Sequence, residues 1–351
     1  MTFRRRFLAL VVPLVAACLT AVAAVSLPQR LTDREFWRLI TETSEPDGFF
    51  RSDNLLSNEL GFQYVVPELM RTTKPGQAYL GVGPEQNFTY IVGTKPAMVF
   101  IVDVRRGNLR LQLMYKALFE LSVDRAEFVS RLFGRKRPRG LDATSTATEI
   151  FSAFSTVPPS DGLYEETLRA ISSLLVKKHG FELSKQDLDG IGYVYGAFHK
   201  YGPDIQYAST SSFGGSLQPD YADLMTAADQ SGAARSYLAT EQNFQFMKSL
   251  EGRNMLVPVV GNFAGQKAIR AMGRYLREKN AIVSAFYLSN VEQYLRQDGI
   301  WEQFCANVAT LPLDDTSTFI RSVRRSGAGA PGFGLASELG NMQRDVQSCR
   351  L

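Results

Sequence analysis

The hydrophobic positions of the 351-residue chain fall into two kinds of segment that alternate along the sequence. Short, almost continuous apolar runs are typical of strands buried on both faces. Longer segments repeat apolar residues at helical spacing, and two of them are followed by Gly180 and Gly202. The pattern predicts strands at 78–80, 98–103, 236–239, 255–260, 281–288 and 318–323, and the last of these is the final strand expected along the chain. It predicts helices within 32–72, near 89–92, at 109–133, 163–179, 185–201 and 241–251, and after the turns at 261–265 and 289–292.

This alternation predicts an α/β fold, a doubly wound and mainly parallel Rossmann-like sheet. The helical residues 109–232 stand between the second and third predicted strands, so we expect a helical insertion or lid there. The expected organisation has an export signal or membrane anchor at 1–29 and N-terminal helices with the first βα units at 30–108. The insertion follows at 109–232, and the second half of the core with a C-terminal tail occupies 233–351.

The N-terminus carries the pattern of an export signal. Arg4, Arg5 and Arg6 precede a run from Phe7 to Gln29 without charged residues, which ends in small side chains. The arginines also resemble a twin-arginine signal, and Val15–Cys18 resembles a lipoprotein processing box. An uncleaved anchor is a third possibility, since 19 apolar residues can just cross a bilayer. All three alternatives predict an exported protein, periplasmic or attached to the membrane through its N-terminus and facing outward.

Charge argues against a nucleic-acid partner. The net charge is +4, and the three N-terminal arginines supply most of it, leaving about +1 for the rest of the chain. Nucleic-acid binders carry a basic face well beyond that value, because they neutralise many phosphates.

Few residues are available for metal binding or disulfide formation. The chain has two histidines and neither a CxxC nor an HExxH pattern, so we expect no metal site. Cleavage of the leader would leave Cys305 and Cys349. In an oxidising compartment this pair can form a disulfide, and the alternative is two separate buried thiols.

The most informative chemical pattern is a glycine turn followed by an acidic residue. Gly81 and Gly83 come where a strand turns into a helix, a place where backbone approaches ligands closely. Asp103 ends the next strand, 20 residues after Gly83. This spacing suits a carboxylate that accepts from both hydroxyls of a ribose lying over the turn. A structural alternative is that Asp103 caps a helix or pairs with Arg105 or Arg106.

These residues resemble the first two motifs of class I S-adenosylmethionine-dependent methyltransferases, with Gly81-Val82-Gly83-Pro84 as the first and Val102-Asp103 as the second. Glu85 replaces the third glycine of that pattern. The stretches 257–265 and 286–294 resemble a bacterial family that is described only as methyltransferase-like. The resemblance implies S-adenosylmethionine as cofactor, with no metal. Its binding residues would be Gly81, Gly83, Glu85, Asn87, Asp103 and Arg105.

Polar residues after the later predicted strands are the candidates for catalysis. They are Asn262, Asn290 and Glu292, which lie where open α/β sheets bind ligands. Capping of the following helices is the alternative role for the two asparagines. The leading hypothesis is therefore an exported enzyme that transfers a methyl group to an unknown small molecule. Because this cofactor is made in the cytoplasm, the alternative is a non-catalytic exported module on the same fold, which binds a nucleoside-like or other polar ligand or a partner protein.

Overall fold

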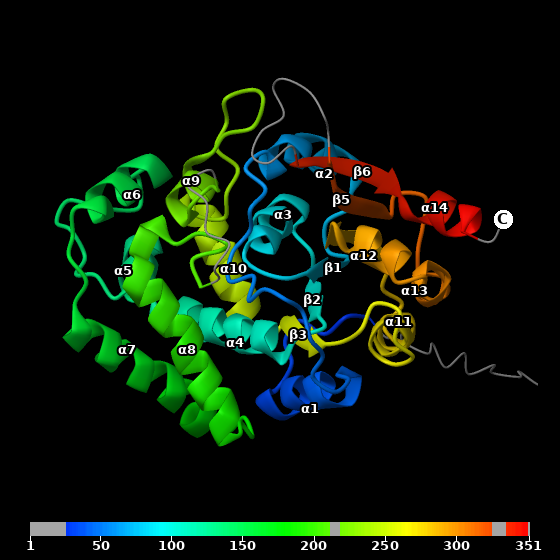
Figure 1. The fold of residues 1–351 in the computed structure, drawn as a ribbon, viewed down its shortest axis with the longest axis horizontal. Helices are drawn as coiled ribbons and strands as arrows, with labels where there is room; N and C mark the ends of the chain where they lie inside the picture. Colours follow the sequence, from blue (N-terminus) through cyan, green and yellow to red (C-terminus); the bar gives the residue numbers. More distant parts are fainter. Residues whose placement is uncertain (1–25, 211–217, 325–334, 350–351) are drawn as a thin grey trace, which may run out of the picture.

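Six strands form one sheet in the computed structural model, which describes residues 26–210, 218–324 and 335–349 (Figure 1). The spatial order is β3-β2-β1-β4-β5-β6. Neighbouring strands from β3 to β5 are parallel, and β6 is antiparallel to β5. The strands are β1 (Ala78–Val82), β2 (Met98–Asp103), β3 (Leu256–Val260), β4 (Val283–Ser289), β5 (Thr318–Arg324) and β6 (Leu335–Asn341).

Helices cover both faces of this sheet. The α-helices are α1 (Asp33–Thr43), α2 (Val66–Thr72), α3 (Gln86–Thr94), α4 (Arg106–Leu121), α5 (Arg125–Phe133), α6 (Ala147–Ser155), α7 (Asp161–Ser173), α8 (Lys185–Tyr201), α9 (Tyr221–Thr226), α10 (Glu241–Gly252), α11 (Ala268–Glu278), α12 (Val291–Gln297), α13 (Trp301–Val308) and α14 (Met342–Ser348). Three short helical segments are η1 (Phe62–Val65), the π-helical η2 (Leu174–Lys178) that extends α7, and η3 (Gly202–Asp204).

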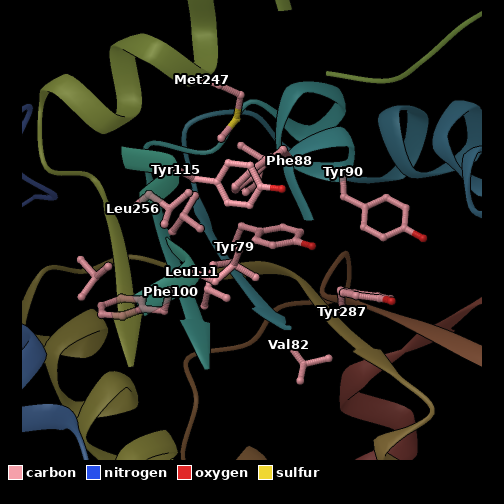
Figure 2. Packing of buried hydrophobic residues seen from close by; sticks show 14 of the residues in the cluster. Tyr79, Val82, Phe88, Tyr90, Phe100, Leu111, Tyr115, Met247, Leu256 and Tyr287 are labelled. Atoms are coloured by element: carbon pink, nitrogen blue, oxygen red, sulfur yellow. The ribbon is translucent and has the colours of Figure 1, made fainter. Parts of the chain in front are cut away.

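The core is a layer of aromatic and aliphatic side chains between the sheet and the helices α3, α4 and α10. Figure 2 shows Phe88, Tyr115 and Met247 of these helices gathered over the strand residues Tyr79 and Leu256. The rings of Phe88 and Tyr115 meet edge to face at 5.1 Å. Every residue of β1, β2 and β3 is buried, as the continuous apolar runs predicted. The α/β class and the mainly parallel sheet are therefore confirmed.

Several predicted elements are wrong in detail. Residues 236–239 form a turn and no strand, because Tyr237 is held by packing against the rings of Phe88 and Phe119 rather than by strand pairing. The predicted helix at 109–133 is two helices, since Asp124 accepts from the Glu127 N–H and starts α5 anew. β5 is not the final strand, because β6 follows it.

The helices α4 to α10 connect β2 to β3, and α4 itself packs on both of these strands. In Figure 1 the green helices α5 to α8 lie to the left of the sheet, and α5, α7 and α8 contact α4. Of the predicted export segment, residues 1–25 with the three arginines and Cys18 lie outside the described residues. None of the helices in the described ranges is long and apolar enough to cross a bilayer. Cys305 and Cys349 form a disulfide, which decides between the two alternatives for this pair.

Candidate functional site

The carboxyl ends of the parallel strands are crossed by residues 44–60, here called the crossing segment, which joins α1 to α2 (Figure 1). It begins at β3, where the Glu45 N–H donates to the carbonyl of Val260 at 2.8 Å. It continues past β2, where the Gly48 N–H donates to the carbonyl of Val104 at 2.8 Å. The chain's own backbone therefore occupies the start of the edge at which open α/β sheets bind ligands.

The same segment then reaches β1 and β4. The Ser57 N–H donates to Glu85 Oε1 at 3.1 Å, directly after the glycine turn of β1. Glu59 is buried at the end of β4, where Tyr287 Oη and Ser289 Oγ donate to its Oε1 at 2.8 and 2.7 Å. β1 and β4 flank the point where the direction of strand order reverses, so the crossing segment covers the topological switch point.

The glycine turn joins β1 to α3, as the sequence predicted, but side chains of the chain itself fill part of it. Gly83 has a φ of 76°, which favours glycine. A Cβ on Gly81 would lie 1.8 Å from Asn87 Oδ1, because the Asn87 side chain folds over this residue. Asn87 Nδ2 donates to the carbonyls of Val82 and Pro84 at 2.8 and 2.7 Å, and Tyr79 Oη donates to Asn87 Oδ1 at 2.9 Å. Asn87 thus stabilises the turn itself.

Asp103 is paired with Arg105, and both side chains are buried. Arg105 Nε and Nη2 lie 3.2 and 3.1 Å from the two carboxylate oxygens, and the Arg105 N–H donates to Oδ1 at 2.9 Å. Arg105 Nη1 donates to the carbonyls of Ser52 and Asp53 in the crossing segment. The carboxylate expected to bind a ribose is therefore held by an arginine that also ties down the crossing segment.

Glu85 is fully buried where the resemblance would place a third glycine. Burial raises the pKa of this carboxyl from 4.5 to about 8, and the hydrogen bond from the Ser57 N–H opposes the shift only in part. At neutral pH the side chain is therefore protonated and carries no charge. The neighbouring Gln86 accepts from Ser57 Oγ and donates to Glu59 Oε2 at 3.0 Å, so Ser57 and Gln86 together connect the two buried acids.

The three residues proposed for catalysis do not meet. Asn262 follows β3, whereas Asn290 and Glu292 follow β4. Because β2 and β1 lie between these two strands, three spacings of about 4.8 Å place their ends roughly 14 Å apart. Asn262 Oδ1 accepts from the Ala264 N–H at 2.9 Å, and Glu292 pairs with Arg321 at 2.9 Å. Asn290 precedes α12 without a side-chain capping bond in the described structure.

Sequence reasoning missed four polar residues near the glycine turn. Ser57 and Glu59 belong to the crossing segment, whose course depends on contacts far along the chain. Asn108 and Gln112 lie one turn apart in α4, both buried, and Gln112 Nε2 donates to the Gly83 carbonyl at 2.9 Å. Their signal in the sequence is an amide pair at a spacing of four residues directly after β2, in a row that Lys116 and Glu120 continue.

A cavity lies apart from this edge of the sheet. It has a volume of about 310 Å³ at the amino end of β5 and is lined by Glu68, Thr72, Asp315 and Asn341, among others. In the ranges that the structure describes, no three histidine, cysteine or acidic side chains gather in a group suited to a metal ion.

The comparison with protein families assigns the chain to a family whose description names no activity. Residues 55–142 and 145–347 match the model of a family described as a domain of unknown function, DUF7790. The chain belongs to this family. The matched residues run from the end of the crossing segment through β6, so the DUF7790 domain includes the whole sheet and the glycine turn. No curated protein matches the sequence.

Proposed function

We propose that this DUF7790 protein is an exported module with a Rossmann-like, methyltransferase-related arrangement that binds a small polar ligand at the carboxyl edge of its sheet without transferring a methyl group. The strand order β3-β2-β1-β4-β5-β6 is that of the Rossmann fold, apart from the antiparallel direction of β6. An antiparallel edge strand is common on such sheets. The ligand site of this arrangement is the switch point between β1 and β4.

One observation carries the non-catalytic part of the proposal. Arg105 binds both carboxylate oxygens of Asp103 and two carbonyls of the crossing segment. A ribose that used Asp103 would have to displace this arginine and leave a buried guanidinium without its carboxylate, which is costly. The side chain of Asn87 over Gly81 adds a second obstruction. The residues present therefore do not fit S-adenosylmethionine.

Calorimetry of the purified protein with S-adenosylmethionine and S-adenosylhomocysteine tests this proposal. We expect no saturable heat with either compound up to 1 mM, a concentration at which a ligand with micromolar affinity would saturate the site. Arg105→Ala serves as the comparison, because it frees the Asp103 carboxylate. Micromolar binding to the unmodified protein would overturn the proposal.

Methyl transfer is the second candidate, and the geometry of Gly83 favours it. Gly83 adopts a conformation that favours glycine, and a Cβ built on it meets no atom within 4 Å beyond its chain neighbours. A turn of this kind lets a ligand approach the backbone closely. Under this candidate the crossing segment would move aside, and the calorimetric experiment above would give micromolar binding.

Export is the remaining part of the proposal. The charge-free run after the three N-terminal arginines and the Cys305–Cys349 disulfide both support an oxidising compartment outside the cytoplasm. A reporter enzyme that is active only outside the cytoplasm, fused after residue 45, should be active. Replacement of Arg4 and Arg5 by lysine should stop export if the twin-arginine pathway is used. Cys18→Ala should release the protein from the membrane if Cys18 is lipidated.

A further inference from the structure

Four buried polar atoms near the glycine turn have no hydrogen-bond partner among the described residues. They are Glu85 Oε2, Asn108 Oδ1, Asn108 Nδ2 and Gln112 Oε1. The three residues are at most 2% exposed. Buried polar groups in folded proteins are nearly always paired, because each unpaired one opposes folding. A concentration of such atoms at one place therefore calls for partners outside the chain, either ordered water or a ligand.

The covalent and hydrogen-bonded structure brings these atoms around Gly83. Gln112 Nε2 donates to the Gly83 carbonyl at 2.9 Å, which fixes the Gln112 amide beside the turn. Asn108 lies four residues earlier in α4 and so shares that helix face. Glu85 follows Gly83 by two residues. Gly83, Glu85, Asn108 and Gln112 are here called the polar chamber.

Independent evidence for space comes from Gly83 itself. The residue is buried, and yet a Cβ built on it would meet no heavy atom within 4 Å apart from those of its chain neighbours. Protein interiors are close-packed, so open space beside a buried backbone atom marks a void. The ring of Tyr115, three residues further along α4, packs against Phe88 (Figure 2).

The atoms around the void are chemically balanced and uncharged. Asn108 offers an NH₂ donor and an acceptor oxygen, and Gln112 offers a second acceptor oxygen. Burial raises the Glu85 pKa to about 8, so at pH 7 its carboxyl offers an O–H donor. The nearby guanidinium of Arg105 is already bound to Asp103 and to the crossing segment. A carboxylate would face two amide oxygens here without a free cation, and a cation would face the Asn108 NH₂ group.

We propose that the polar chamber binds an uncharged amide- or hydroxyl-bearing group of a small-molecule ligand. This inference rests on the proposed function, because it names the chemistry that the ligand presents at the carboxyl edge of the sheet. Ser57 of the crossing segment bonds to Glu85 and covers the chamber, so entry requires that this contact opens.

Acetamide, acetate and acetamidinium have nearly the same shape and differ in charge, so they test the proposal directly. Each is titrated into the purified ¹⁵N-labelled protein at pH 7 and followed by the amide resonances of Gly83, Asn108 and Gln112. We expect saturable shifts with acetamide and at least tenfold weaker binding of acetate and acetamidinium. Equal binding of a charged probe, or no saturable shift with acetamide, would overturn the proposal.

Two variants separate binding from folding. Asn108→Leu removes two unpartnered atoms and should raise the melting temperature of the protein. It should also weaken the binding of acetamide at least tenfold. Gln63→Leu is the matched control, because the Gln63 amide is equally buried but bonded to Leu224 and Arg235. It should lower the melting temperature and leave acetamide binding unchanged. Acetamide shifts that survive Asn108→Leu would also overturn the proposal. Micromolar binding of S-adenosylmethionine would instead overturn the proposed function, and the comparison of the three probes does not depend on that result.

Discussion

Asp103 has one carboxylate and two possible partners, the hydroxyls of a ligand and the guanidinium of Arg105. Both uses demand the same residue type at the same strand end, so the sequence predicts the position of the acid without deciding its partner. The partner of Asp103 is determined by Ser52 and Asp53, about fifty residues earlier in the chain. Their carbonyls accept hydrogen bonds from Arg105 and hold it over the carboxylate. The structural alternative that pairs Asp103 with Arg105 is the arrangement observed.

Asp103→Ala should destabilise the protein strongly, because it leaves the buried Arg105 without its carboxylate. Loss of one partner of a buried pair typically costs about 3–5 kcal/mol. Asp103→Asn should cost less, since its amide oxygen can still accept from the Arg105 N–H. Urea unfolding of both variants measures the free energy of unfolding. A cost below about 1 kcal/mol for Asp103→Ala would contradict a role for the pair in stability.

At the scale of elements, the sequence predicts best where one local pattern determines the structure. β2 is apolar at every position before Asp103, and α8 has the predicted bounds of 185–201 and ends directly before Gly202. β6 is half-buried and contains Ser337, Glu338 and Gly340, so neither alternation nor continuous apolarity marks it as a strand. The only local signal in the crossing segment is the turn sequence Pro46-Asp47-Gly48. The rest of its course depends on contacts with four different strand ends.

Two glycines of α8 test how much of that helix is set by its own propensity. A Cβ on Gly192 would meet nothing within 4 Å, so Gly192→Ala should stabilise the protein by about 0.5–1 kcal/mol. Gly190→Ala is the matched control, since its Cβ would lie 2.5 Å from Arg110 Cδ and disturb the Arg110–Asp187 pair. Thermal unfolding should show a gain for the first variant and none for the second. An equal gain for both would contradict the close contact at Gly190.

At the scale of the whole molecule, two fully buried acids should control how stability depends on pH. Burial raises the pKa of Glu85 and of Glu251 to about 8, whereas in the unfolded chain both titrate near 4.5. Between these values the folded state binds more protons than the unfolded state, so stability falls as pH rises. Their contribution is fully present below about pH 4.5 and is lost progressively up to about pH 8.

Urea unfolding at pH 5, 6, 7 and 8 should therefore show a decreasing free energy of unfolding. One such carboxyl accounts for at most about 1.4 kcal/mol per pH unit. Glu251→Gln removes one of the two titrating groups and should reduce the slope by roughly half. A free energy that stays constant or rises from pH 5 to pH 8 would show that the two carboxyls are ionised in the folded protein.

The disulfide between Cys305 and Cys349 closes a loop that contains β5, β6 and α14. For a sequence separation of 44, loop-closure entropy gives a stabilisation of about 4 kcal/mol. The disulfide acts mainly by restricting the unfolded chain. The double variant Cys305→Ser/Cys349→Ser should lose about this amount in urea unfolding. The reductant dithiothreitol should lower the stability of the natural chain to the same level and leave the variant unchanged. Because β6 pairs only with β5 within the described residues, its amide protons should lose more protection from hydrogen exchange than those of β1. Two reactive thiols in the unfolded, unreduced protein would contradict this prediction, since a closed disulfide leaves neither cysteine free.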